Sequence, residues 1–329
     1  MINNSTVKVH VVTYRRSHLL VRALESLIVQ TNKNWIAEVI NDDPNDDQVT
    51  KIINDLSDPR IFLSEPQIHR GGTENFNFAF RSKETPYACL LEDDNWYEED
   101  FLEYMLSSLD RFPDIELACA NETIWKEMED GSWLNTNKTI WENNKDFDVF
   151  KYNLLDKCGS AKICNSSMFW RTKNSPHWQT PRSIPIDVTE HFRERVTPHP
   201  ILLVNKPLVN YSETINSYRS NNHSTWGSYQ VLLIGSAFML CPISERIELA
   251  DSLWQRANVQ KQLYTSLLFT GLVFKESRLL WQKSPLSLKL RFFLTIIRRP
   301  NSSLATLKAK TLKVEAYNFL TSNSNCKTT

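Results

Sequence analysis

Glycine is scarce in this chain, with 7 residues among 329. Loops that hold phosphate through their backbone amides need closely spaced glycines, so a glycine-rich phosphate loop is not expected. Charge of one sign is also missing, because 38 Lys and Arg residues balance 38 Asp and Glu residues. A chain without net charge does not have the basic field that broad nucleic-acid binding requires. We therefore expect no nucleic-acid partner.

Metal-binding cysteine pairs and long apolar runs are missing too. None of the six cysteines forms a CxxC pair, which argues against a common zinc knuckle. The longest apolar run, 231–243, contains Gly235 and Ser236 and is shorter than the roughly 20 residues of a membrane span. We interpret it as a buried helix. The first residues show no secretion signal, so we predict reduced thiols in a cytoplasmic protein.

What the sequence does have is a regular alternation of strand and helix patterns in its first third. The expected strands are 7–13, 36–40, 61–63 and 87–91, and the expected helices are 17–30, 48–56, 73–81 and 98–112. Such alternation implies a parallel sheet with helices on both faces. The later expectations are a strand near 115–120, a helix at 187–194, strand ends at 201–204 and 208–211, and helices beyond Trp226.

Three consecutive acids, Glu92, Asp93 and Asp94, directly follow the apolar strand 87–91. Adjacent carboxylates repel one another unless a cation neutralises them. In open α/β sheets, ligands bind at the carboxyl ends of the strands, and the acidic loop 41–47 lies at the same edge. The acids are therefore a candidate metal and phosphate site, although acids also favour the first turn of a helix.

Residues 11–16 and 20–31 resemble the opening of the family 2 glycosyltransferases, which have the GT-A fold. The turn at 42–43 is similar to that family's Asp-Asp-Gly-Ser turn, and 72–80 lies where the family has a Gly/Asn-rich segment. The acids at 92–94 occupy the place of its DxD-type motif. The resemblance covers 7–215, with Pro-Asn in place of Gly-Ser after the first acidic pair and Glu92 where Asp or a small residue is common.

The resemblance implies an α/β protein with a Rossmann-like, mostly parallel sheet flanked by helices and a helical C-terminal appendage. It implies a nucleotide-sugar donor and a Mn²⁺ or Mg²⁺ cofactor. The residues that it assigns to the nucleotide are Thr13, Tyr14, Arg16, Asp42, Asp43, Gly72 and Asp93. For the metal it points to Asp94, with Glu92 and His223 as further candidates. A lone loop histidine such as His223 is also compatible with simple solvation.

An inverting sugar transfer needs a general base near the acceptor hydroxyl. The family supplies it from an acid upstream of a Pro-Leu-Val-x-Tyr segment, which is present here at 207–211. Counting back gives Asp187 as the favoured base and Glu190, one helical turn further, as the second candidate. Asp187 is also compatible with a helix N-cap. Tryptophans between 125 and 170 suit either sugar stacking or the core.

The segment 281–313 carries eight Lys and Arg residues, no Asp or Glu, and a dense set of apolar residues. This composition suits an interfacial helix on anionic lipid, or a helix docked on its own domain with a solvated basic face. We expect a glycosyltransferase domain at 1–225, divided into a nucleotide-sugar-binding half, 1–112, and an acceptor-binding half, 113–225. A helical region follows at 226–329.

The sequence thus predicts a metal-dependent, inverting transferase of the hexosyltransferase type. It would move a sugar to a saccharide or lipid-linked acceptor in cell-surface polysaccharide or glycan synthesis, as a peripheral protein at the inner face of the membrane. A nucleotidyltransferase of the same fold is disfavoured because 13–17 is no glycine- and lysine-rich loop. The alternative from another class is a non-catalytic carbohydrate- or nucleotide-binding scaffold that kept the fold.

Overall fold

The structure is a computed structural model that describes residues 6–65, 68–81, 83–142, 147–153, 163–173, 178–197, 200–215 and 223–322. The chain forms two compact units, which we describe separately. The sheet unit comprises Met1–Tyr152, Lys162–Gln179 and Thr197–Tyr218. The helical unit comprises Asn153–Ala161, Thr180–Val196 and Arg219–Thr329.

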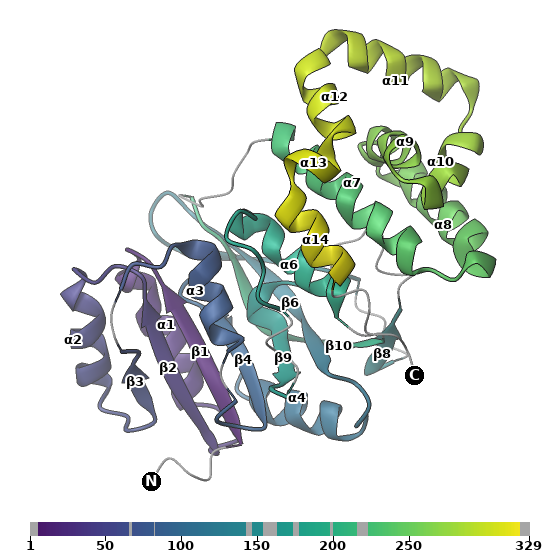
Figure 1. Cartoon of the computed structure of the whole chain (residues 1–329). Helices are drawn as coiled ribbons and strands as arrows, with labels where there is room; N and C mark the ends of the chain where they lie inside the picture. Colours follow the sequence, from purple (N-terminus) through teal and green to yellow (C-terminus); the bar gives the residue numbers. More distant parts are fainter. Residues whose placement is uncertain are drawn as a thin grey trace. The chain divides into compact units, whose positions relative to one another are not determined.

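The sheet unit is built on a mixed sheet whose first four strands are parallel (Figure 1). These strands are β1 (Val7–Thr13), β2 (Trp35–Asn41), β3 (Ile61–Leu63) and β4 (Tyr87–Glu92). In the described residues the strand order is β3-β2-β1-β4-β9-β6-β10-β5. Because β2 and β4 flank β1, the loops that follow them meet beside the end of β1. The prediction of both acidic loops at one edge of the sheet is confirmed.

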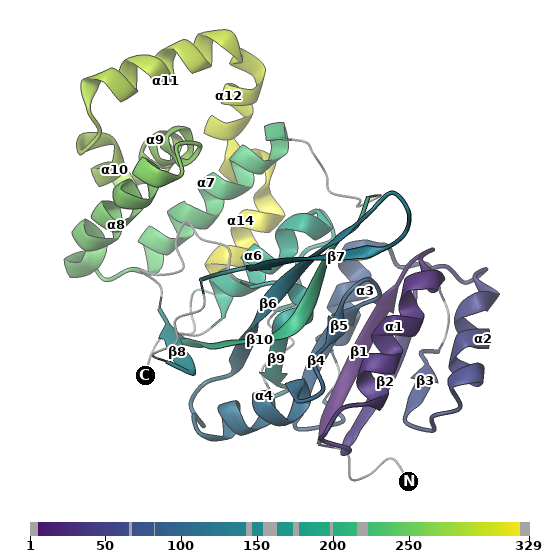
Figure 2. The ribbon, with the colours of Figure 1, turned by 180° about the vertical axis from the view of Figure 1, so that it is seen from behind.

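Helices pack on both faces of this sheet, as the alternation of patterns predicted. The helices are α1 (Ser17–Ile28), α2 (Asp47–Leu56), α3 (Gly72–Ala79) and α4 (Phe101–Asp110). Alternate residues of β1 (Val7, Val9 and Val11) share a core with buried residues of α1, α2 and α4. Figure 2 shows α1 in front of β1 on this face, and Figure 1 shows α3 on the opposite face.

The second half of the sheet differs most from the sequence predictions. Its elements are β5 (Trp96–Tyr97), β6 (Leu117–Glu127), β7 (Trp133–Thr139), β8 (Val149–Tyr152), η1 (Asn165–Ser167), β9 (Met168–Arg171) and β10 (Ile201–Glu213). The helix expected at 98–112 begins only at Phe101, because β5 first pairs with β10. The two expected strand ends are one strand, β10, whose register against β6 shifts at Pro207. Strands β7, β8 and β9 were not predicted.

The helical unit surrounds the apolar helix α7 (His223–Leu240), which contacts α6, α9, α12, α13 and α14. A helix that is apolar all round is typically buried on all sides. The other elements are α6 (Ile186–Val196), η3 (Ile243–Glu245), α8 (Arg246–Val259), α9 (Leu263–Val273), η4 (Lys275–Ser277), α10 (Arg278–Gln282), α11 (Leu286–Arg298), α12 (Pro300–Leu307), α13 (Ala309–Leu312) and α14 (Val314–Ser322).

The helical unit begins earlier in the chain than the predicted boundary after residue 225. Helix α6 contacts α7 and α14, so 180–196 cluster with the C-terminal helices although β10 of the sheet unit follows them in sequence. Among the described helices, none combines the length and the hydropathy needed to span a membrane.

Candidate active site

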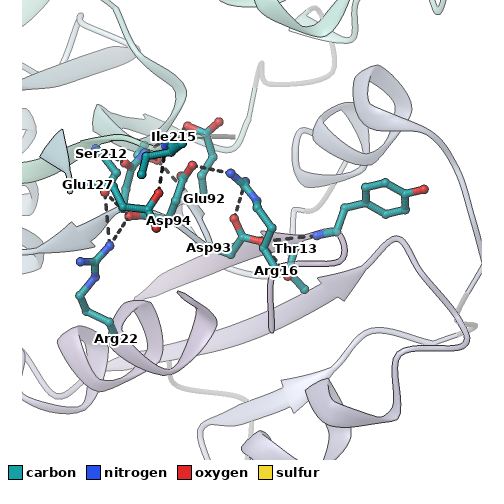
Figure 3. A network of polar contacts seen from close by, with 12 residues as sticks. Thr13, Arg16, Arg22, Glu92, Asp93, Asp94, Glu127, Ser212 and Ile215 are labelled. Atoms are coloured by element: carbon teal, nitrogen blue, oxygen red, sulfur yellow. Dashed lines mark hydrogen bonds and ion pairs between the residues drawn. The ribbon is translucent and has the colours of Figure 1, made fainter. Parts of the chain in front are cut away.

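Asp93 lies at the centre of a polar network at the carboxyl edge of the sheet (Figure 3). Its side chain is fully buried, accepts a hydrogen bond from the Thr13 hydroxyl at 2.8 Å, and accepts a longer one from the Tyr14 backbone N–H at 3.4 Å. The Arg16 guanidinium donates Nη2 to Asp93 at 2.5 Å and Nη1 to Asp94 at 2.6 Å. One cationic side chain therefore bridges two adjacent carboxylates.

Burial and neighbouring charges shift the pKa values of Asp93 and Arg16. It raises the pKa of Asp93 to about 7, and the neighbouring Asp94 carboxylate adds to this rise while Arg16 opposes it. Burial alone would lower the pKa of Arg16, but the two carboxylates raise it above its ordinary value. The site therefore attracts positive charge, and Arg16 supplies it in this structure.

The backbone of Asp94 is held from the other side by Arg22 of α1 and Ser212 of β10. Arg22 Nη2 donates to the Asp94 carbonyl at 2.8 Å, and the Ser212 hydroxyl donates to the same oxygen. The Ser212 backbone N–H also donates to Asn95 Oδ1 at 2.8 Å. Figure 3 shows Arg16 and Arg22 approaching the acidic segment from different sides. The position of Asp94 is thus fixed by two elements distant in sequence.

The Arg22 side chain itself packs against two tryptophan rings. Its guanidinium carbon lies 3.7 Å from the ring centroid of Trp96 and 4.1 Å from that of Trp133, which are cation–π distances. Burial lowers the pKa of Arg22 to about 10, with Asp94 and Glu127 acting in the opposite direction. The side chain therefore keeps its charge at neutral pH and has little freedom to move.

Asp42, in the other acidic loop, anchors the segment that leads into α3. Its buried carboxylate accepts the backbone N–H of Arg70 at 2.6 Å and that of Gly71 at 3.1 Å. Gly71 has a φ of +82°, which only glycine adopts readily, and the helix begins at Gly72. Glycine is therefore required by the backbone at position 71, next to the predicted site residue Gly72.

A partly exposed aromatic pair lies beside this loop. The rings of Tyr14 and His69 are stacked with centroids 5.6 Å apart, and 38 % of Tyr14 is exposed. The guanidinium carbon of Arg15 lies 5.0 Å from the centroid of the Tyr14 ring. Arg15 Nε donates a hydrogen bond to Asp43 at 2.7 Å. The bond from Arg15 lowers the pKa of Asp43. The face offers a flat ring next to fixed charges, which suits a nucleotide base and ribose.

Glu92 is turned toward the η1 segment. Its carboxylate accepts the Ser166 hydroxyl at 3.0 Å and the Asn95 amide at 3.4 Å, and its backbone N–H donates to Ser166 at 3.1 Å. These contacts differ from those of Asp93 and Asp94, both of which face Arg16. The sequence had named Glu92 as a further metal candidate, and the structure shows it linking β4 to η1.

The donor set at this edge fits a hard divalent cation. Mg²⁺ and Mn²⁺ bind through one or two carboxylates together with substrate phosphates and water. Asp93 and Asp94 are two such carboxylates, already compensated by positive charge. Within the part of the chain that the structure describes, no group of three or more His, Cys, Asp and Glu side chains is arranged to hold a metal ion. A metal ion bound here would therefore need further ligands from a substrate or from water.

Comparison with known proteins agrees with this geometry. The sequence model described as "Glycosyl transferase family 2" matches residues 8–172, which include β1, both acidic loops and β9. The chain belongs to glycosyl transferase family 2. The resemblance noted from the motifs is confirmed.

Individual relatives of this family 2 chain are distant. The proposed colanic acid biosynthesis glycosyl transferase WcaA of Escherichia coli (strain K12) is 26 % identical over 108 residues, which are 32 % of this chain and 39 % of WcaA. The chain thus matches about two fifths of the length of that curated relative.

Solved structures resemble the chain over nearly its whole length. S. aureus TarS 1–349 in complex with UDP has a TM-score of 0.60 and 12 % identity, covering 97 % of this chain and 88 % of that one. The same protein in complex with UDP-GlcNAc has a TM-score of 0.60 and covers 96 % and 90 %. At this identity the likeness shows the fold alone, and the predicted GT-A fold class is confirmed.

The family 2 site residues predicted from sequence fall into two groups. Those at the sheet edge come together there: Thr13, Tyr14, Arg16, Asp42, Asp43, Gly72, Glu92, Asp93 and Asp94. Asp187 and Glu190 lie on α6 in the helical unit. Helix α6 begins at Ile186, so Asp187 lies in its first turn and not at the cap position before it. His223 begins α7, and its side chain lies outside the described part of the chain.

Several residues of this family 2 site were not predicted. Arg22, Ser166 and Ser212 contact the acidic segment, and only Arg22 has a sequence signal, since it lies one turn after Leu19 near the buried side of α1. His191, one turn after Asp187, is partly exposed, and desolvation by the surrounding protein lowers its pKa to about 4 although Asp187 opposes this effect. It is therefore neutral at neutral pH.

The tryptophans expected either to stack on sugars or to lie in the core differ in their burial. Trp141 and Trp170 are buried, and Trp170 packs on Phe80 with ring centroids 4.8 Å apart. Trp125 and Trp133 are only partly buried and lie 5.3 Å and 6.2 Å from the Trp96 ring. Trp96 and Trp133 of this cluster contact Arg22, which binds the Asp94 carbonyl.

Proposed function

We propose that this family 2 chain is a glycosyltransferase that binds a nucleotide-sugar donor at the carboxyl edge of its sheet and transfers the sugar to a saccharide or lipid-linked acceptor. The observation that carries the proposal is the convergence of Thr13, Arg16, Asp93 and Asp94 where β1 and β4 end. Carboxylates at this position can hold a divalent cation that, together with Arg16, would balance the dense negative charge of a diphosphate. The name of WcaA supports a role in polysaccharide synthesis.

In the proposed complex, Asp94 would hold Mn²⁺ or Mg²⁺, and the ion would supply positive charge for the departing diphosphate. Thr13 and the Tyr14 backbone fix the Asp93 carboxylate, and Arg22 fixes the Asp94 backbone, so both acids are positioned before the donor arrives. The exposed Tyr14 ring receives the nucleotide base. Pre-positioned charge of this kind is effective because it needs no rearrangement during the reaction.

The transfer itself is a single displacement with inversion. Asp187 accepts the proton of the acceptor hydroxyl while its oxygen forms a bond to the anomeric carbon. The bond from that carbon to the diphosphate oxygen breaks, and the nucleoside diphosphate leaves with the bonding electrons. Glu190 is the second candidate for the base.

Calorimetry tests the donor site. The wild-type chain is expected to bind UDP or GDP in the presence of Mn²⁺, and Asp94→Asn is expected to weaken this binding by at least about tenfold, as loss of a ligand group does at metal sites. Glu99→Gln removes an exposed carboxylate of the same segment and serves as the matched control. A wild-type chain that binds no nucleoside diphosphate with Mn²⁺ or Mg²⁺ would overturn the proposal.

Turnover separates the transferase from the non-catalytic scaffold. On a panel of nucleotide-sugars, Asp187→Asn is expected to lower donor hydrolysis or transfer by about 10²- to 10⁴-fold, as loss of a general base does, while nucleotide binding is unchanged. Glu190→Gln in the same assay identifies the base if Asp187→Asn stays active. Nucleotide binding without any turnover in the wild-type chain would favour the scaffold.

A further inference from the structure

Helix α11 is attached to the helical unit by one of its faces. Phe292 on this face is 2 % exposed, and its ring lies 4.6 Å from that of Phe269 and 5.7 Å from that of Trp281. Leu288 and Ile296, one turn to either side, pack against the same core. These contacts satisfy the ordinary need of an amphipathic helix to bury an apolar stripe.

The opposite face of α11 is also apolar, and it is exposed. Its five side chains have spacings of i, i+4, i+7, i+8 and i+11, which place them along one side of a helix. They are Leu286 (72 % exposed), Leu290 (58 %), Phe293 (50 %), Leu294 (51 %) and Ile297 (74 %). We call this set the outer stripe. A contiguous exposed apolar patch of this kind marks an interaction surface.

Basic residues border the outer stripe on both sides. By the helical period, Lys289 lies along one edge of the stripe, and Arg291 and Arg298 lie along the other. The whole segment 281–313 has eight Lys and Arg residues and no Asp or Glu. A partner that matches this surface would therefore carry negative charge at its edges and an apolar layer between them. An anionic lipid surface has both features.

The length of α11 argues against a transmembrane position, and its charge argues against a second copy of the chain as its partner. Its 13 residues extend about 20 Å at 1.5 Å per residue, less than the roughly 30 Å hydrocarbon core. The helix therefore suits a position along the interface and not across the bilayer. A second copy of the chain docked on this face would bring like charges of the basic borders together, which is unfavourable.

We propose that the outer stripe of α11 inserts into the headgroup region of an anionic membrane, with its basic borders contacting lipid phosphates. Figure 1 shows α11 on the outside of the helical unit, beside α9 and α12. The proposal goes beyond sugar transfer and applies to a catalytic chain and to a scaffold alike. It would keep the protein at the surface where a lipid-linked molecule lies.

Vesicle co-sedimentation of the full chain tests this proposal. We expect binding to phosphatidylcholine vesicles that contain phosphatidylglycerol, weak binding to phosphatidylcholine alone, and a loss of binding as salt screens the charges. The triple variant Leu290→Glu, Phe293→Glu and Ile297→Glu is expected to reduce binding to anionic vesicles by about 100-fold or more, because it removes apolar contact and adds repulsion.

The matched control carries three acids elsewhere on the same unit: Ile243→Glu, Ile247→Glu and Val259→Glu, at side chains that are 80 %, 56 % and 86 % exposed. It changes the net charge by the same amount as the stripe variant does, and it is expected to keep vesicle binding. Circular dichroism and the melting temperature check that both variants fold. Vesicle binding is measured without nucleotide, so a failure of the membrane proposal would not count against the transferase proposal.

Three results would overturn the proposal. They are a wild-type chain that does not bind anionic vesicles, a control variant that loses as much binding as the stripe variant, and equal binding to neutral vesicles. Light scattering adds a fourth: a wild-type dimer that the stripe variant converts to a monomer would assign the outer stripe to a second copy of the chain.

Discussion

Two neighbouring aspartates at the end of β4 have different surroundings. Asp93 is fully buried and its pKa is raised to about 7, whereas 15 % of the Asp94 side chain stays exposed beside the same arginine. The difference arises because Asp93 points under Thr13 while Asp94 reaches toward solvent. This agrees with the proposed division of roles, with Asp94 facing the cation and Asp93 fixed among protein donors.

Glu122 on β6 is a second buried acid, close to this site. Burial raises its pKa to about 8, with Cys164 and Ser167 acting against this shift and Glu92 adding to it. A carboxyl group whose pKa is raised by folding binds its proton more tightly in the native state. Its contribution to stability is complete below about pH 4.5, the ordinary value, and is lost as the pH rises toward 8.

Glu122→Gln is therefore expected to become more stable relative to wild type as the pH rises from 5 to 8. The difference in the free energy of unfolding should grow by up to about 1.4 kcal/mol per pH unit, because one proton is involved. Urea denaturation at several pH values measures it. Glu129→Gln, at an exposed glutamate in the turn after β6, should show no such trend, and a flat difference for Glu122→Gln would contradict the expectation.

At the scale of elements, α7 packs tightly against the segment that follows α9. A Cβ atom added to Gly235 of α7 would overlap the ring of Phe274, which is fully buried. Gly227 of the same helix has more room, because its Cβ would lie 3.6 Å from Thr306 Oγ1. The two glycines therefore serve different purposes in one helix.

Gly235→Ala is expected to lower the free energy of unfolding by about 1–3 kcal/mol, since overpacking a full core forces its neighbours to shift. Gly227→Ala, the matched control, is expected to be neutral or to stabilise by up to about 1 kcal/mol, because alanine favours helix interiors. Chemical denaturation compares the two variants. Equal effects at both positions would show that Phe274 can move aside.

On the scale of the whole molecule, the C-terminal helices are part of the core that buries α6. Phe192 of α6 is fully buried, and its ring lies 5.8 Å from Tyr229 of α7 and 6.2 Å from Phe319 of α14. A fragment that ends at residue 218 would expose this side chain and Val188. Each fully buried apolar side chain of this size contributes about 1.5–3 kcal/mol.

The fragment 1–218 is therefore expected to melt at a lower temperature than the full chain and to bind a hydrophobic dye. Differential scanning fluorimetry and dye fluorescence measure both effects. The control is a chain that lacks only residues 323–329, which follow α14. Its melting temperature and dye binding should match those of the full chain. Unchanged stability of 1–218 would show that the sheet unit does not need the C-terminal helices for its stability.

Sequence patterns were most reliable where local signals are strong. The first four strands and their helices lie within a few residues of the predicted ranges, because buried parallel strands are continuous apolar runs and amphipathic helices repeat with a fixed period. Strands β7, β8 and β9 were missed because they are short or rich in Trp and Asn, and because the partners of β8 and β9 are distant in sequence.

By itself, the sequence determined the family, the α/β class and the edge of the sheet where the acids lie, since these follow from motifs and from the direction of parallel strands. Only the tertiary structure decided which groups meet there. It brought Arg16 onto both Asp93 and Asp94, Arg22 and Ser212 onto the Asp94 backbone, and Ser166 onto Glu92. It also showed which side of α11 is exposed. Contacts between residues far apart in the chain depend on packing, which no local pattern encodes.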